Sequence, residues 1–346
     1  MINKNLIVRT SFYLFIATML IAILIPVFFF VSTSVYSEYE VYEFPRSFLP
    51  KTSFDLEIEW QNDQYDLSVF DDATNEYELL IQSNDPDRFR LYLKRSLSIQ
   101  LDNEQIEKDF SQSKNGEPIY LTYKKDLFYN YKTFFSITNN AGKSVINSVI
   151  AAGWTILISL FFGSLAGYSI ARYKFAGKSQ LSLTLLIVRM FPGVAIAIPM
   201  LVYLIKMNLD NTMIGLAIVY SVGNIALTAW ITSSIFTGIN IELEEASYIF
   251  GATKLQTFRK ITLPLAFPGF IACSMYAFLA AWNDSITALI LSNNNPTLSL
   301  VIYKAIGSSS AIQLSAAGAV ILILPALVFT FIIKNYINQL WGEVKL

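Results

Sequence analysis

The stretch Ser11–Val35 reads SFYLFIATMLIAILIPVFFFVSTSV, and no charged side chain interrupts the chain between Arg9 and Glu38. An α-helix needs about 20 apolar residues to cross the hydrocarbon core of a bilayer. A cleaved signal peptide has a shorter apolar core of about 7–15 residues, followed by small residues at the cleavage site. This stretch is longer and has no such site after it, so it predicts a retained membrane-spanning helix.

Further intervals without a charged side chain lie at 144–171, 211–241, 261–283, 285–303 and 305–333. The chain of 346 residues is 54% hydrophobic and 15% charged, whereas soluble domains carry about 25% charged residues. We therefore expect an all-α polytopic membrane protein with six transmembrane helices. The expected spans are Ser11–Val35, Ser144–Ala171, Leu181–Ile205, Thr212–Phe236, Leu265–Leu291 and Ile312–Ile333.

Prolines lie inside the third expected span, at Pro192 and Pro199, and inside the sixth, at Pro325. Lipid offers no partner to the backbone groups that a proline frees, so neighbouring helices must supply one. We expect ordinary helix kinks at these positions.

Several chemistries are excluded by residue type. The chain has no histidine, which removes an imidazole base, a Ser-His-Asp triad and a histidine-ligated metal. A single cysteine, Cys273, cannot form an internal disulfide or a thiolate cluster. The formal net charge of −1 gives no reason to expect a nucleic-acid partner.

Basic residues beside the spans predict the orientation, because cytoplasmic loops are enriched in lysine and arginine. With six crossings, most of these residues share one face, and both termini are expected in the cytoplasm. These residues are Lys4, Arg9, Arg172, Lys174, Lys178, Lys254, Arg259, Lys260, Lys334 and Lys345.

Residues 38–143 form the one long hydrophilic segment and are expected outside the cytoplasm. They hold 20 acidic against 12 basic side chains. Residues 54–60 alternate apolar and charged side chains, as a half-buried strand does, and residues 90–93 and 119–123 are also expected to be strands. A short helix is expected over 102–112, which gives a small β-rich (α+β) inserted domain.

The acidity of this domain is open to two interpretations, a solvated surface or a docking face for another extracytoplasmic protein. Asp71 and Asp72 lack the spaced pattern of a calcium loop. The expected organisation is residues 1–37 as the N-terminus and first helix, 38–143 as the inserted domain, and 144–346 as a five-helix core.

Residues 240–263 lie between the fourth and fifth spans and predict two short helices. Asn240 is a suitable N-cap, and the acids that follow it suit the positive end of a helix dipole. Gly251 can end the first helix in a left-handed turn, and Ala252 and Thr253 then begin the second. Large apolar residues such as Tyr248, Ile249 and Phe250 need a partner, either the bilayer surface or a groove in another protein.

This loop resembles a known signature. Glu245-Ala246-Ser247, three residues, Gly251, nine residues and Ile261-x-Leu263-Pro264 are similar to the E-A-A-x3-G-x9-I-x-L-P pattern of permease subunits in binding-protein-dependent ABC importers. Ser247 replaces the second alanine and keeps a small side chain. Residues 191–193, 278–284 and 298–300 resemble the carbohydrate, maltose-like branch.

The resemblance implies a coupling helix that seats in a cleft of a separate ATPase subunit, with Glu245 in polar contact there. It implies partners as well: a second permease subunit, two ATP-binding subunits that hold ATP and Mg²⁺, an extracytoplasmic solute-binding protein, and membrane lipid. This chain would be non-catalytic. The coupling residues expected from it are Glu244, Glu245, Ala246, Ser247, Phe250, Gly251, Ala252 and Thr253.

The chain itself offers no phosphate loop. Residues 142–144 and 177–179 both read Gly-Lys-Ser, but the earlier glycine that a phosphate loop requires is Ile137 in one case and Arg172 in the other. The main alternative to an ABC importer is an ion- or proton-coupled secondary transporter acting without an ATPase.

A solute pathway is harder to place. Asp284 is the one acid well inside an expected span, and acids in a membrane usually face a cavity or a partner. Trp282 and Asn283 beside it are candidates to stack on and hydrogen-bond a sugar, or to be structural residues near the membrane surface. Arg189 and Asn224 are candidates for lining the pathway or for bridging helices.

Overall fold

The computed structural model describes residues 4–44, 47–61, 63–72, 74–114, 117–137, 141–308 and 311–340. Lys345, which contributes to the predicted orientation, lies outside these residues. The chain divides into two compact units, Met1–Asn139 with Ala305–Ile321, and Asn140–Lys304 with Leu322–Leu346.

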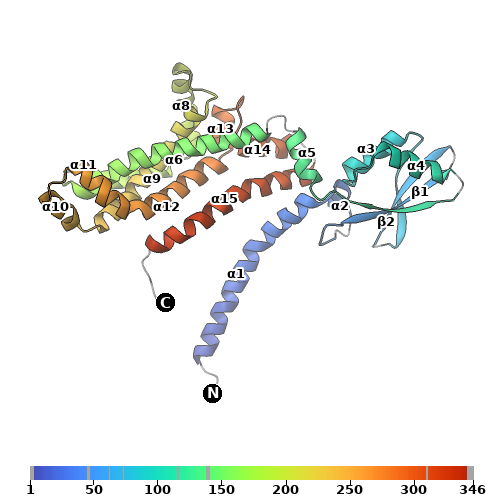
Figure 1. Cartoon of the computed structure of the whole chain (residues 1–346), viewed down its shortest axis with the longest axis horizontal. Helices are drawn as coiled ribbons and strands as arrows, with labels where there is room; N and C mark the ends of the chain where they lie inside the picture. Colours follow the sequence, from blue (N-terminus) through green and yellow to red (C-terminus); the bar gives the residue numbers. More distant parts are fainter. Residues whose placement is uncertain are drawn as a thin grey trace. The chain divides into compact units, whose positions relative to one another are not determined.

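The first unit contains a long apolar helix and a small α+β domain (Figure 1). A four-stranded antiparallel sheet has the order β3-β2-β1-β4. The elements of the N-terminal part are α1 (Lys4–Val35), α2 (Glu38–Tyr42), β1 (Ser53–Gln61), β2 (Gln64–Asp71), β3 (Glu76–Ser83), α3 (Pro86–Ser96), α4 (Asn103–Ser113), β4 (Ile119–Lys124) and α5 (Tyr129–Ile137).

The core of this domain lies between one face of the sheet and helices α3 and α4. Alternate residues of β1, such as Leu56 and Ile58, are buried there, as the period-two pattern predicts. The helices contribute Phe89 and Phe110, whose ring centroids are 4.8 Å apart. The strands predicted at 54–60 and 119–123 and the helix predicted at 102–112 are confirmed.

The strand predicted at residues 90–93 is wrong, because this segment belongs to helix α3. Asp85 caps the helix by accepting a hydrogen bond from the Asp87 amide, and Pro86 occupies the first turn. Phe89 and Leu93, four residues apart, then point to the same side and are buried. Helical spacing therefore outweighs the short alternating pattern.

A buried ion pair connects α2, the short helix after α1, to the end of β4. Lys125 Nζ lies 2.5 Å from Glu40 Oε2, and both side chains are fully buried. The other carboxylate oxygen accepts the Lys51 amide, and Oε2 also accepts the Ser37 amide. Asn130 Nδ2 donates to the carbonyl oxygens of Ser34, in the last turn of α1, and of Tyr36, just after it. The domain is thus held to α1 by buried polar contacts.

The second unit is built around α6, α9 and α12, which run side by side (Figure 1). The remaining elements of the chain are α6 (Ala141–Arg172), α7 (Lys178–Met190), α8 (Gly193–Lys206), α9 (Met213–Gly238), α10 (Ile241–Ile249), α11 (Lys254–Thr257), the π-helical turn η1 (Phe258–Thr262), α12 (Leu263–Asn283), α13 (Ile286–Leu291), α14 (Leu298–Ser308) and α15 (Ile312–Leu340).

Among the described residues, five helices are long and apolar enough to cross a membrane, or up to six if α7 and α8 count as one span. These two helices meet at an angle of 90° around Phe191 and Pro192. The predicted third span is therefore broken and not merely kinked at Pro192, whereas Pro199 and Pro325 lie inside helices. The predicted fifth span also ends early, because α12 stops at Asn283.

Close packing of α6 on α9 depends on small residues. An added Cβ at Gly167 would lie 2.0 Å from Thr232 Oγ1 and 2.8 Å from the Ala229 carbonyl oxygen. Gly153, on the same helix, would meet no atom within 4 Å. The two glycines therefore differ in how much space they leave.

We expect Gly167→Ala to lower the thermal stability of the detergent-purified protein, because overpacking a tight contact costs about 1–3 kcal/mol. The matched variant Gly153→Ala should keep or slightly raise the midpoint of unfolding, since alanine favours the helix. Equal midpoints for the two variants would contradict the proposed close contact.

Candidate functional site: the helical loop between α9 and α12

The loop between α9 and α12 forms its two short helices through local hydrogen bonds. Asn240 Oδ1 accepts the Glu242 amide at 3.0 Å and caps α10. Gly251 has φ +84°, the left-handed conformation that glycine adopts at little cost. Thr253 and Gln256 form a reciprocal capping box at the start of α11. The predicted cap at Asn240, the turn at Gly251 and the helix start at Thr253 are confirmed.

Glu244 on α10 is the polar centre of the site, with only 3% of its surface exposed. Its Oε1 accepts hydrogen bonds from Arg172 Nε at 3.0 Å, Arg172 Nη2 at 2.8 Å and Thr262 Oγ1 at 2.9 Å. Its Oε2 accepts the Tyr168 hydroxyl at 3.0 Å. Tyr168 and Arg172 belong to α6, and Thr262 ends η1. One carboxylate therefore joins the loop to α6 and to the segment that continues into α12.

The environment keeps Glu244 ionised. Burial by itself favours the neutral acid, but hydrogen bonds from Arg172, Thr262 and Tyr168 and the charge of Arg172 together hold the pKa of Glu244 below its ordinary value. A carboxylate with a lowered pKa stabilises the folded state above its unfolded pKa. That contribution is lost as the pH falls through the lowered value. The ion pair between Glu244 and Arg172 is therefore fully formed at neutral pH.

Ser247 closes the two short helices against each other. Its hydroxyl lies 2.6 Å from Thr257 Oγ1 and donates to the Glu244 carbonyl oxygen at 2.7 Å. The Ala252 amide in turn donates to the Ser247 carbonyl oxygen at 3.0 Å, across the Gly251 turn. The residue that departs from the alanine of the family signature is thus used for an internal hydrogen bond.

Aromatic rings from four elements pack together next to the loop. The ring of Tyr168 lies 5.3 Å from that of Phe236 and 5.0 Å from that of Phe258. Phe236 also contacts Phe270 of α12 at 6.1 Å. These residues come from α6, α9, η1 and α12, so the polar centre at Glu244 rests on an apolar cluster that all four elements share.

The opposite side of the loop is exposed and apolar. Ile249 is 85% exposed and Phe250 is 90% exposed, and Leu243 and Leu255 are also exposed. Glu245, Ala246, Gly251 and Thr253 lie at the surface, and Ala252 is half-buried. The predicted coupling residues therefore divide into two groups, with Glu244 and Ser247 facing the protein and the others, apart from the half-buried Ala252, at the surface.

The predicted pathway residues do not form one cluster. Arg189 Nη1 donates to Asn224 Oδ1 at 3.4 Å, and Asn224 is buried and donates to the Tyr220 carbonyl oxygen at 2.8 Å. This pair joins α7 to α9. Arg189 itself is exposed.

Trp282, Asn283 and Asp284 have separate environments at the end of α12. Trp282 is buried, donates to the Leu322 carbonyl oxygen at 2.9 Å and stacks on another aromatic ring. Asp284 follows the last helical residue, and its carboxylate accepts the amide and hydroxyl of Thr287 at 2.8 and 2.7 Å. Asn283 is exposed. In this conformation Asn283 is the most accessible of the three.

Sequence reasoning did not identify Tyr168, Thr257 and Thr262 as parts of the site, and it used Arg172 only as an orientation marker. Their signal is weak, because a tyrosine and an arginine at the end of a span also suit the membrane interface. Within the described ranges, no group of three or more Cys, Asp or Glu side chains is placed to hold a metal ion.

The profile of a family described as "Binding-protein-dependent transport system inner membrane component" matches residues 159–342. The trehalose transport system permease protein SugB of Mycobacterium tuberculosis is 32% identical over 235 residues, which cover 66% of this chain and 84% of that protein. The maltodextrin transport system permease protein MdxG of Bacillus subtilis is 28% identical over 199 residues, 56% of this chain and 72% of that protein.

Among solved structures, a chain from a bacterial ABC transporter involved in the import of the acidic polysaccharide alginate aligns with a TM-score of 0.61. The alignment covers 97% of this chain and 99% of that chain at 16% sequence identity. At this identity the likeness concerns the fold.

We expect Arg172→Met to loosen the loop, because removing one partner of a buried ion pair costs about 3–5 kcal/mol. Hydrogen exchange of the α10 amides should become faster. The double variant Arg172→Met with Glu244→Gln should recover part of the protection, since no charge is left buried without a partner. Arg259→Met, which changes an exposed base of the same loop, is the control. Unchanged exchange in Arg172→Met would contradict an anchoring role for Glu244.

Proposed function

This chain belongs to the family of binding-protein-dependent transport system inner membrane components, and on that premise we propose that its α10–η1 loop is the coupling element that receives the movement of a separate ATPase. The chain is a permease subunit of an ABC importer. The observation that carries the proposal is the division of the loop into a buried side, anchored through Glu244, and an exposed apolar side at Ile249 and Phe250.

The anchoring gives the coupling a physical route. A rigid element transmits displacement only if its attachment does not give way under the applied force. Glu244 is bonded to Arg172 at the end of α6 and to Thr262 just before α12. Movement of the exposed side by a partner would therefore displace both helices together. Such rigid-body displacement is a common way of switching between two states.

The exposed side supports docking into a protein groove. An apolar helix face that packs on nothing in its own chain marks an interaction site. Glu245, Ala246, Phe250, Gly251 and Thr253 would lie at this interface. ATP and Mg²⁺ would be held by the partner, and this chain would contribute no catalytic residue.

We assign the transported solute to the saccharides. Relatives named for trehalose and maltodextrin transport support this class. Arg189 and Asn224 between α7 and α9, with Asn283 at the end of α12, are the proposed pathway residues, and Trp282 and Asp284 would shape the site through their internal contacts.

The assembly follows from the family. We propose one second permease subunit, two ATP-binding subunits and an extracytoplasmic solute-binding protein, in the bacterial cytoplasmic membrane with both termini of this chain in the cytoplasm. In this arrangement α7 and α8 form one broken span, giving six crossings in total.

The inserted domain, residues 38–143, would then lie on the side where the solute-binding protein delivers its cargo. Its sheet has one face free of α3 and α4, where Asp55, Glu57 and Asp66 alternate with the buried residues. Tyr77 and Tyr120 share this face, with ring centroids 5.4 Å apart. We propose that this acidic and aromatic face docks the solute-binding protein.

Gly251→Asp should leave the helices folded but uncouple transport from ATP hydrolysis. The left-handed conformation costs an ordinary residue about 1 kcal/mol, and the new charge sits beside the docking side. Gly251→Asn tolerates the same conformation without charge and should transport nearly normally. Phe250→Asp adds the charge without the strain and should uncouple too. Normal uptake by both aspartate variants in proteoliposomes would reject the docking role.

Deleting residues 45–135 should weaken the affinity of the solute-binding protein and lower uptake, while the ATPase subunits still bind. Because the deletion also removes Lys125, the double variant Glu57→Lys with Asp66→Lys tests the same face in the intact domain. Unchanged affinity in both variants, measured with the complex in nanodiscs, would reject a docking role for the domain.

A further inference from the structure

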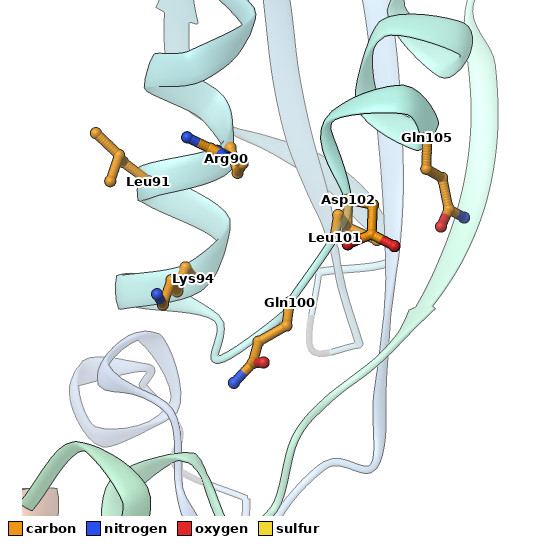
Figure 2. A pocket seen from close by; sticks show the side chains of 7 residues that line it. All are labelled: Arg90, Leu91, Lys94, Gln100, Leu101, Asp102 and Gln105. Carbon is orange, nitrogen blue, oxygen red and sulfur yellow. The ribbon is translucent and has the colours of Figure 1, made fainter. Parts of the chain in front are cut away.

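A polar cleft lies between α3 and the segment that leads into α4 in the inserted domain. Its volume is about 460 Å³, within the range of about 300–1,000 Å³ typical of small-molecule sites. Figure 2 shows the two walls, which come from α3 on one side and from residues 100–105 on the other. The lining residues are Arg90, Leu91, Lys94, Gln100, Leu101, Asp102 and Gln105.

The fold holds these walls in place. Phe89 of α3 and Phe110 of α4 are buried against each other in the core of the domain and fix the two helices. The turn between the walls is fixed at Ser98, which has φ +58° and whose carbonyl oxygen accepts the Asp126 amide at 2.9 Å. The Ile99 amide donates back to the Leu93 carbonyl oxygen at 3.0 Å. The cleft is therefore pre-formed and not the result of a loose loop.

Hydrogen-bond donors and acceptors both line the cleft. Arg90 and Lys94 are four residues apart and lie on the same side of α3, where they contribute donors only. Asp102 occupies the N-cap position of α4, yet its side chain makes no capping hydrogen bond, so its carboxylate contributes acceptors. Gln100 and Gln105 offer both kinds of group. Leu91, which is exposed, and Leu101 add a small apolar surface.

The charges of the lining narrow the class of ligand. Arg90 pairs with Asp87 at 3.2 Å, and the other charged groups of the lining are Lys94 and Asp102. With Asp87 counted, the cleft is close to neutral. A metal ion would need several carboxylates, and the described lining has one. A lipid chain would need an apolar lining, and the described lining has two leucines. A ligand that both donates and accepts hydrogen bonds, without net charge, fits best.

We propose that this cleft is a saccharide-binding subsite for the end of a short neutral oligosaccharide. Vicinal hydroxyls pair with the ammonium, amide and carboxylate groups of Lys94, Gln105 and Asp102, while Leu91 contacts the C–H face of the ring. The proposal rests on the proposed function, because it requires the domain to lie where the solute arrives. It adds a contact between solute and permease that is separate from Arg189, Asn224 and Asn283.

The test is saturation-transfer difference NMR with maltotriose and the reconstituted permease–ATPase complex in nanodiscs, without the solute-binding protein. We expect transfer to maltotriose protons from the wild type. Lys94→Ala and Gln105→Ala, on opposite walls, should each weaken the apparent affinity about tenfold, as loss of one hydrogen bond to a charged or amide group would. Arg88→Ala and Gln112→Ala change exposed residues of α3 and α4 outside the cleft and are the matched controls.

No transfer to maltotriose from the wild type would overturn the proposal, as would equal transfer from wild type and both cleft variants. Hydrogen exchange of α3 and α4 confirms that each variant is folded, and Lys94→Gln replaces Lys94→Ala if that variant is not. The proposed function is tested separately by ATP-driven uptake of maltotriose with the solute-binding protein present. Uptake by the wild type without transfer at the cleft would overturn the subsite alone.

Discussion

The structure of the second unit depends on a buried carboxylate that has to remain charged. Glu244 is removed from water, which is costly for an ion, and the cost is offset because hydrogen bonds reach it from Arg172, Tyr168 and Thr262. Tyr168 and Arg172 lie near the end of α6, which precedes α9, and Thr262 lies just before α12, which follows it. The short helix α10 is therefore bound to the ends of its neighbouring helices and is more than a connection between them.

The two sides of α10 have different physical requirements. The buried side needs a charge and small polar groups that match each other at hydrogen-bond distance, as Ser247 and Thr257 do. The exposed side needs large apolar residues and a turn that projects them, which Phe250 and Gly251 provide. A residue at the same loop can therefore be essential for anchoring or for docking, and the direction of its side chain decides which.

Sequence patterns predicted those features that arise from local physics. The cap at Asn240, the left-handed turn at Gly251 and the strand at 54–60 depend on neighbours in the chain, and the structure has them. The strand expected at 90–93 failed because a capped helix buries Phe89 and Leu93 together. The partners of Glu244 were missed because they lie about 70 residues earlier and 18 residues later. Contacts over such separations leave no periodic signal in one sequence.

The central claim is that the loop and α6 move as one body when the partner ATPase changes state. A spin label at Lys174, two residues beyond the end of α6, and another at Lys254 in the loop are both at exposed positions. Double electron–electron resonance between them would report the distance between α6 and the loop. A second pair of labels would report the distance between the loops of the two permease subunits. The account predicts that the Lys174–Lys254 distance is the same with and without a bound ATP analogue, while the distance between the two subunits changes. A change in the Lys174–Lys254 distance on nucleotide binding would contradict it.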